Sequence, residues 1–377
     1  MSFPLQTTVS RTGQVNAAGN SRELFLKLFA GEVLTTFKAD NIALGLTRVR
    51  TIRNGKSAEF PMIGKNTAQY HTPGQLINGN KIKHAARIVT IDDVAVSPVF
   101  IADIDEAMTH YEFRSQYSQE GGSALAELVD RNIFRMVTKA AYITSKTEAT
   151  QAITDGSLLG SVLDDEDFTA NVVVPSAYTG EHIVSAIFKA RTILKKANIK
   201  QVPVCVLPPE VYELLVNIQD TNKVTWMNKD VGGTGSMAEG SIARVAGISI
   251  LESNHLPQEE KGTQTDPKPI ADATVGSGHE TKYDVEARGL VGLIFTPDCV
   301  ATVKLMDVQT KDVPEPLRLG TTILSKLCVG HNILRPACAI AIVAKGSQAE
   351  LAMGTNKVEV VDLGAAAALA ASTRKAK

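Results

Sequence analysis

The sequence predicts a protein of the α+β class, and three observations carry that prediction. Residues 48–91 alternate apolar and polar side chains around turn-forming glycine, proline and asparagine, which is typical of a two-stranded β-ribbon. From about 103 to 143, apolar residues recur every three or four positions, as in a long helix. Beyond this helix, predicted strands and helices alternate. Because the 377 residues exceed the ~250–300 at which one core stops growing, we expect more than one domain.

The ribbon and the helix carry opposite charge, although the formal net charge of the whole chain is only −1. Residues 48–87 contain eight Lys or Arg against one acid, Glu59, whereas residues 92–130 contain nine acids against one base, Arg114. An isolated two-stranded ribbon is marginal in water, so it needs a surface to lie on. We therefore expect the ribbon to contact the acidic helix of a neighbouring copy. The alternative is that the two segments neutralise each other within one subunit.

Side chains on both segments are candidates for this contact between copies. Exposed ion pairs contribute only ~0–1 kcal/mol each, so several have to act together. The predicted contact residues are Lys56, Lys65, Tyr70 and Lys81 on the ribbon and Asp103, Glu106 and Glu112 on the helix.

The other elements follow in order from local sequence. Residues 1–20 are polar and indicate an arm, and residues 24–37 place apolar side chains at helical spacing. Within the long helix, Gly121-Gly122 indicates a bend or tight packing. We then expect helices at 181–197 and 208–216, and strands at 201–207, 241–252, 289–296, 300–305 and 339–343. A polar loop occupies 257–283, and the Ala/Gly-rich tail 347–377 is expected to be an appendage.

No pattern of residues indicates catalysis, a cofactor or a metal. Residues 233–238 fit the G-x-G-x-x-A form of a dinucleotide loop, but no clear strand precedes them and a strand follows, where the fingerprint needs a helix. The seven histidines lack the spacing of a zinc site. The four cysteines lie in apolar contexts without a CxxC pair, so we expect buried thiols. We therefore expect no enzyme activity, catalytic residue, cofactor or metal.

The chain also shows no targeting segment. The N-terminal residues lack the charged and apolar regions of a signal peptide, and no apolar run approaches the ~20 residues that span a bilayer. We therefore expect a protein that folds in the cytoplasm.

Several motifs resemble those of a known family. They include Gly55-Lys-Ser-Ala58, Phe60-Pro61, Gly64-Lys65, Tyr70 and Pro73-Gly74 in the ribbon, His110-Tyr111 and Tyr117 in the helix, and Thr302-Val-Lys-Leu305 and Leu334-Arg-Pro336 towards the end. These motifs are similar to those of major capsid proteins from T7-like short-tailed (podovirus) double-stranded DNA bacteriophages. The resemblance spans roughly residues 20–346 and fades at 146–180 and 257–283.

The resemblance implies the HK97-like phage capsid fold and a division of the chain that goes with it. An N-terminal arm (1–47) and an extended loop (48–91) would precede a peripheral domain with a long spine helix (92–150 and 298–346). An axial α/β domain (151–297) would surround the centres of pentamers and hexamers, and residues 347–377 would form a C-terminal extension.

The function implied by the resemblance is structural. Copies would assemble as pentamers and hexamers into an icosahedral shell that encloses phage double-stranded DNA without sequence-specific binding and without a membrane. A scaffolding protein and a portal are implied partners by analogy, and the location is the virion, assembled in the host cytoplasm. A near-neutral subunit fits this role, because a strongly basic inner wall would retain DNA. Two alternatives stay open: an encapsulin-like bacterial nanocompartment shell protein, and an α/β nucleotide-binding enzyme that uses the glycine loop.

Overall fold

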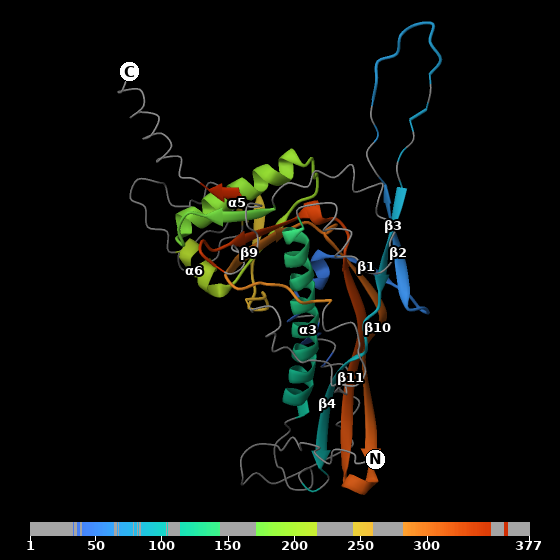
Figure 1. Cartoon of the computed structure of the whole chain (residues 1–377). Coiled ribbons are helices and arrows are strands. Elements are labelled where there is room, and N and C mark those ends of the chain that lie inside the picture. The colour runs from blue at the N-terminus through green and yellow to red at the C-terminus, as the bar shows by residue number, and fades with distance from the viewer. Residues whose placement is uncertain are drawn as a thin grey trace.

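Two sheets, a long helix and a projecting ribbon make up the structure, which is a computed structural model (Figure 1). A long, narrow hairpin runs beside helix α3, and a wider sheet carrying helices α5 and α6 lies at one end of that helix. The structure describes residues 33, 36–37, 40–63, 66, 68–77, 79–80, 82, 84–102, 104, 114–143, 171–216, 244–258, 282–347 and 358–360.

The narrow sheet has four strands in the order β1-β10-β11-β4. Its centre is the antiparallel hairpin of β10 (Val300–Glu315) and β11 (Gly320–Ile333), which the short helix η4 (Pro316–Arg318) joins. Strand β4 (Ala95–Ala102) pairs antiparallel with β11, and β1 (Arg48–Thr51) pairs parallel with β10. The first residues of the predicted ribbon therefore belong to this sheet.

The ribbon itself consists of β2 (Ser57–Ile63) and β3 (His84–Thr90), paired antiparallel. Along β2 the side chains alternate, with Ala58, Phe60 and Met62 buried and their neighbours exposed. In the loop between the strands, the Gln75 amide donates to the Thr72 carbonyl oxygen at 3.2 Å and Gly74 has φ +92°. A proline followed by a glycine with positive φ is the signature of a type II turn. The predicted β-ribbon with turns is confirmed.

The wider sheet has seven strands in the order β13-β5-β12-β9-β6-β8-β7. Five of them, β13, β5, β12, β6 and β8, point the same way, whereas β9 and β7 run in the opposite direction. The predicted strand 241–252 is divided into β7 and β8 by a turn at Ala246-Gly247, where φ is 53° and 76°. The strand bounds are β5 Val172–Pro175, β6 Val204–Leu207, β7 Arg244–Val245, β8 Ile248–Glu252, β9 Leu290–Phe295, β12 Ala339–Val343 and β13 Val358–Val360.

Helices cover both faces of the seven-stranded sheet. α5 (Gly180–Lys196) and α6 (Pro209–Val216) pack with side chains such as Val173 on one face. The long helix α3 (Arg114–Tyr142) belongs to the core on the other face, where the Phe134 and Phe295 rings meet edge to face with centroids 6.4 Å apart. All four residues of β5 are therefore buried.

Some predictions about these elements need refinement. Of the predicted helix 103–143, the part before residue 114 lies outside the described residues except for Ile104, and α3 continues through Gly121-Gly122 without a break. The tail 347–377, expected to be an appendage, contributes β13, which pairs parallel with β5. β12 lies in the range 298–346 grouped with the peripheral domain but pairs within the seven-stranded sheet, so the domain boundaries stay a prediction. No helix in the described part of the chain is long and apolar enough to cross a membrane.

Candidate functional site

The structure describes two of the seven predicted contact residues. The side chain of Lys56 is exposed, and that of Tyr70 is fully exposed on the loop between β2 and β3. The proposed pairing of ribbon and helix therefore stays a prediction. The remaining predicted contact residues, Lys65, Lys81, Asp103, Glu106 and Glu112, lie outside the described residues.

Of the five bases of the basic segment that the structure describes, three have partners within their own chain. Arg87 is fully buried, and its Nε donates to the carbonyl oxygen of Ile333 at 2.5 Å. Arg50 Nη1 donates to the Glu59 carbonyl oxygen at 2.6 Å. Arg48 Nη1 lies 3.7 Å from a carboxylate oxygen of Asp298. These three bases stabilise the subunit, so the number that can contact a neighbour is smaller than the sequence count indicates.

Two acids of the acidic segment likewise hold their own chain together. Asp92 accepts a hydrogen bond from Lys282 Nζ at 2.7 Å and another from the Tyr283 hydroxyl. The buried Asp130 carboxylate on α3 accepts from the backbone amides of Ile42 and Ala43 at 2.9 and 3.0 Å. These bonds fix the segment that precedes β1 onto α3. Asp92 and Asp130 therefore stabilise the fold of their own subunit.

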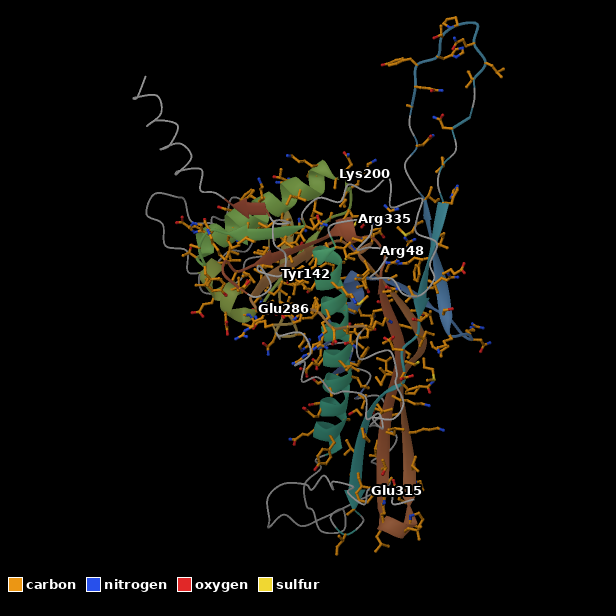
Figure 2. All side chains as sticks on the ribbon, in the orientation of Figure 1. Arg48, Tyr142, Lys200, Glu286, Glu315 and Arg335 are labelled. Atoms are coloured by element: carbon orange, nitrogen blue, oxygen red, sulfur yellow. The ribbon has the colours of Figure 1, made fainter. Side chains whose placement is uncertain are left out.

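The root of the ribbon is fixed on β11, and its loop projects away. The Asn332 side-chain amide donates to the Ile88 carbonyl oxygen at 3.0 Å, and the Asp92 amide donates to the Val329 carbonyl oxygen at 3.1 Å. The loop beyond the paired strands extends far from the rest of the chain, with its drawn side chains pointing outwards (Figure 2). This geometry gives the subunit an extended projection anchored on its longest hairpin.

Large apolar side chains are exposed at both ends of the molecule. On the ribbon loop, Tyr70, Leu76 and Ile77 have exposed fractions of 105%, 87% and 73%. At the far end of the β10–β11 hairpin, near the Glu315 labelled in Figure 2, Leu317 and Leu319 have exposed fractions of 101% and 70%. Clustered exposed apolar residues mark contact surfaces. Of these residues, the sequence analysis predicted only Tyr70 as a contact residue. The others could have been found because they are apolar residues beside Pro73-Gly74 and Pro316, in turns that a monomer would keep polar.

A buried polar cluster lies where the ribbon root, β10 and β11 meet. His331 is fully buried; its Nδ1 lies 3.0 Å from Thr302 Oγ1, and its ring meets that of Tyr283 edge to face with centroids 6.3 Å apart. Burial lowers the pKa of His331 to about 4, although the nearby Asp92 acts in the opposite direction. A neutral imidazole is therefore part of the packed interior.

The described residues show little that resembles a reactive centre. All four cysteines are buried free thiols, as predicted, and burial raises the pKa of Cys205 to about 12. A thiol with a raised pKa is a poor nucleophile at neutral pH. No group of three or more His, Cys, Asp or Glu side chains that would hold a metal occurs in the described part of the chain. The glycine loop 233–238 lies outside the described residues.

Comparison with known sequences points to one family. Residues 59–343 match the family model described as Gp10A-like major capsid protein. The major capsid protein of Escherichia phage T7 is 30% identical over 339 residues, which cover 88% of this chain and 94% of that protein. The major capsid protein of Enterobacteria phage T3 is 28% identical over 335 residues, covering 88% and 94%.

Comparison with solved structures gives the same result. The capsid structure of Cyanophage P-SCSP1u aligns with a TM-score of 0.63 at 34% identity and covers 81% of this chain and 88% of that one. The mature capsid of bacteriophage PhiM1 aligns with a TM-score of 0.59 at 17% identity, covering 81% and 87%. At that lower identity the second comparison concerns the fold alone.

Proposed function

The chain belongs to the Gp10A-like family of major capsid proteins, and on that basis we propose that its copies close as pentamers and hexamers into an icosahedral shell around phage double-stranded DNA. Its fold is the HK97-like phage capsid fold. The role of this family is structural, and we propose that the chain has no catalytic activity. The protein is a virion component, and we propose that it assembles in the host cytoplasm.

The observation that carries the proposal is the pair of exposed apolar tips at opposite ends of the subunit. Leu76 and Ile77 on the ribbon loop, and Leu317 and Leu319 on the hairpin tip, are each at least 70% exposed. Burial of apolar surface contributes about 25 cal/mol per Å². Several such contacts, repeated around every subunit, supply the free energy of assembly without any single strong interface. The ribbon and the hairpin are the elements that reach farthest from the subunit (Figure 1).

The proposed partners follow from the same role. The main partner is a further copy of the chain, and a scaffolding protein and a portal are proposed by analogy. The enclosed DNA would be held without sequence-specific contacts, since a chain with a formal net charge of −1 lacks the general basic excess of a DNA-binding protein.

Negative-stain microscopy of the expressed protein tests the proposal directly. We expect closed shells that sediment as large particles. Replacing Leu76 and Ile77 by aspartate is expected to leave the circular dichroism spectrum unchanged, because both side chains are exposed, and to abolish shell formation. Wild-type protein that forms only small discrete oligomers would contradict the proposal.

A further inference from the structure

One edge of the seven-stranded sheet is basic, because the segment of the chain that reaches it is rich in Lys and Arg. Residues 182–209 contain five bases and no acid. All five bases are exposed, and none of them forms an ion pair with another described residue. The bases are Lys189, Arg191, Lys195, Lys196 and Lys200.

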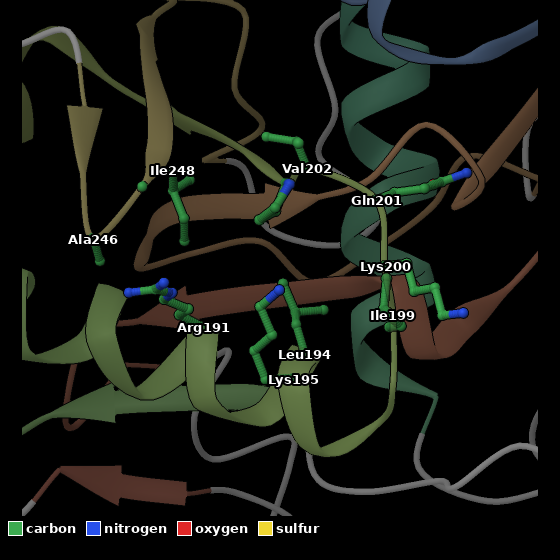
Figure 3. Close-up of a pocket in the computed structure, with 11 residues that line it drawn as sticks. Arg191, Leu194, Lys195, Ile199, Lys200, Gln201, Val202, Ala246 and Ile248 are labelled. Atoms are coloured by element: carbon green, nitrogen blue, oxygen red, sulfur yellow. The ribbon is translucent and has the colours of Figure 1, made fainter.

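Three of these bases surround a pocket with an apolar floor. The pocket has a volume of about 110 Å³ and lies between the last turns of α5, the segment that enters β6 and the turn between β7 and β8 (Figure 3). Arg191, Lys195 and Lys200 line it together with Leu194 and Val202. Val202 is 66% exposed, although it is apolar. Among the described residues beside this edge, Asp298 is an acid; it accepts a hydrogen bond from Gln201 and lies near Arg48.

The opposite edge of the same sheet is acidic. Strands β5, β6 and β8 point the same way, so the residues that follow them share one edge and the residues that precede them share the other. Tyr178, which is 49% exposed, follows β5 at this second edge; partial burial raises its pKa, and the charge of Glu210 raises it further. Arg288 and Lys345 also reach this edge, beside β9 and β12. In the described part of the chain, the exposed acids at this edge are Glu181, Glu210, Glu213 and Glu252.

We propose that the basic pocket of one copy receives Tyr178 and the surrounding acidic edge of the next copy, in a head-to-tail contact around a ring. α5 has 17 residues and is therefore about 25 Å long, so the two edges of one chain cannot meet. Contacts between two different surfaces close into rings when the rotation allows it. A pocket rimmed by cations suits an aromatic ring, whose face attracts positive charge. The inference rests on the proposed function and names the surfaces that join subunits within a pentamer or hexamer.

Cross-linking tests the contact directly. The double variant Tyr178→Cys with Val202→Cys carries one new thiol at each edge, whereas the four native cysteines are buried. After oxidation we expect a ladder of linked chains on a non-reducing gel, extending to five and six copies. Each single variant is expected to give no ladder. Shells without any ladder in the double variant would overturn this inference but not the proposed function, whereas wild-type protein that forms no shells would contradict the proposed function itself.

Charge reversal provides a second test with matched controls. Lys195→Glu with Lys200→Glu is expected to reduce shell yield at least tenfold while the subunit stays folded. Adding Glu210→Lys and Glu213→Lys exchanges the charges of both edges and is expected to restore shells. The control Lys189→Glu with Lys196→Glu makes the same charge change on α5 away from the pocket lining and is expected to assemble. Loss of double-stranded DNA binding by the first variant, without rescue by the second, would instead identify a nucleic-acid surface and overturn the proposal.

Discussion

Gly330 on β11 lies directly against the backbone of Thr90 at the end of β3. A Cβ atom on Gly330 would be 2.1 Å from the Thr90 carbonyl oxygen and 2.7 Å from the Cα atom of Ile91. Since these contacts are with backbone atoms, no side chain can rotate away to relieve them. The glycine therefore allows the root of the ribbon to cross β11 at close range, where Asn332 and Arg87 hold the two segments together.

We predict that Gly330→Ala destabilises the subunit, because the ribbon root has to move away from β11. Overpacking of a closely packed site costs about 1–3 kcal/mol. Urea unfolding of the isolated subunit measures the change. Gly45→Ala is the control, because a Cβ at Gly45 meets nothing within 4 Å. Equal unfolding midpoints for the two variants would show that the close approach has no energetic role.

Gly121 and Gly122 allow a second comparison, between neighbouring positions on α3. A Cβ on Gly122 would be 2.6 Å from the Val33 carbonyl oxygen, whereas on Gly121 the nearest atom is Ser97 Oγ at 3.6 Å. We predict that Gly122→Ala destabilises the subunit by separating Val33, Thr36 and Phe37 from the helix. Gly121→Ala is expected to stabilise it by up to about 1 kcal/mol through helix propensity.

The two glycine variants also separate packing from bending. The sequence left open whether this pair bends the helix as a hinge or allows tight packing. The short distance at Gly122 favours packing at that position. Thermal unfolding measures the stabilities, and microscopy measures shell diameter. A changed diameter in Gly121→Ala, with Gly122→Ala as stable as the wild type, would favour the hinge.

Local sequence predicted the amphipathic elements well and the long-range pairings poorly. α5 begins and ends within one residue of its predicted bounds, because its apolar face recurs at helical spacing. By contrast, β10 extends to Glu315, ten residues beyond the predicted strand, since the described side chains of its projecting half are exposed or only half-buried and give a weak apolar pattern. The parallel pairing of Arg48 with Ala301 joins positions far apart in the chain and leaves no local signal. The contact surfaces also leave little local signal in the sequence. Leu317 is exposed because it lies at the tip of the long hairpin, and the length of that hairpin was not predicted.

His331 is expected to make the subunit sensitive to acid. Its pKa is lowered from 6.5 to about 4 in the folded chain, so between these values the unfolded chain binds a proton that the folded chain does not. Stability therefore falls as the pH drops from about 6.5 to about 4. At about 1.4 kcal/mol per pKa unit, the full loss is on the order of 3 kcal/mol. Burial is the main cause of the lowered pKa, Asp92 acts against it and Lys282 adds to it, while Tyr283 and Thr302 contact the ring.

The measurement is the urea unfolding midpoint of the isolated subunit at pH 7 and at pH 5. His331→Gln removes the titrating group, so its midpoint is expected to change less with pH than that of the wild type. His71→Gln is the control, because His71 is exposed and its replacement leaves the interior unchanged. An equal pH dependence in His331→Gln and the wild type would assign the acid sensitivity to other groups.

The last prediction concerns the contact between the basic ribbon and the acidic helix of a neighbour. Arg48, Arg50 and Arg87 have partners in their own chain, which leaves Arg53 and lysines such as the exposed Lys56 as the candidates. Reversing Lys56, Lys65 and Lys81 to Glu is expected to block assembly and leave a folded, soluble subunit. Reversing Asp103, Glu106 and Glu112 to Lys in the same chain is expected to restore assembly in part.

Ion pairs between copies and ion pairs within one subunit predict different effects of salt on assembly. Ion pairs between copies are screened by salt, so assembly of the wild type should weaken as salt rises, whereas the stability of the isolated subunit should change little. Replacing the three lysines by arginine keeps the charge and is expected to preserve assembly. If the triple reversal to Glu instead unfolds the isolated subunit, as seen by circular dichroism, the charges pair within one chain. That outcome is less compatible with Lys56, whose exposed side chain forms no ion pair with a described residue.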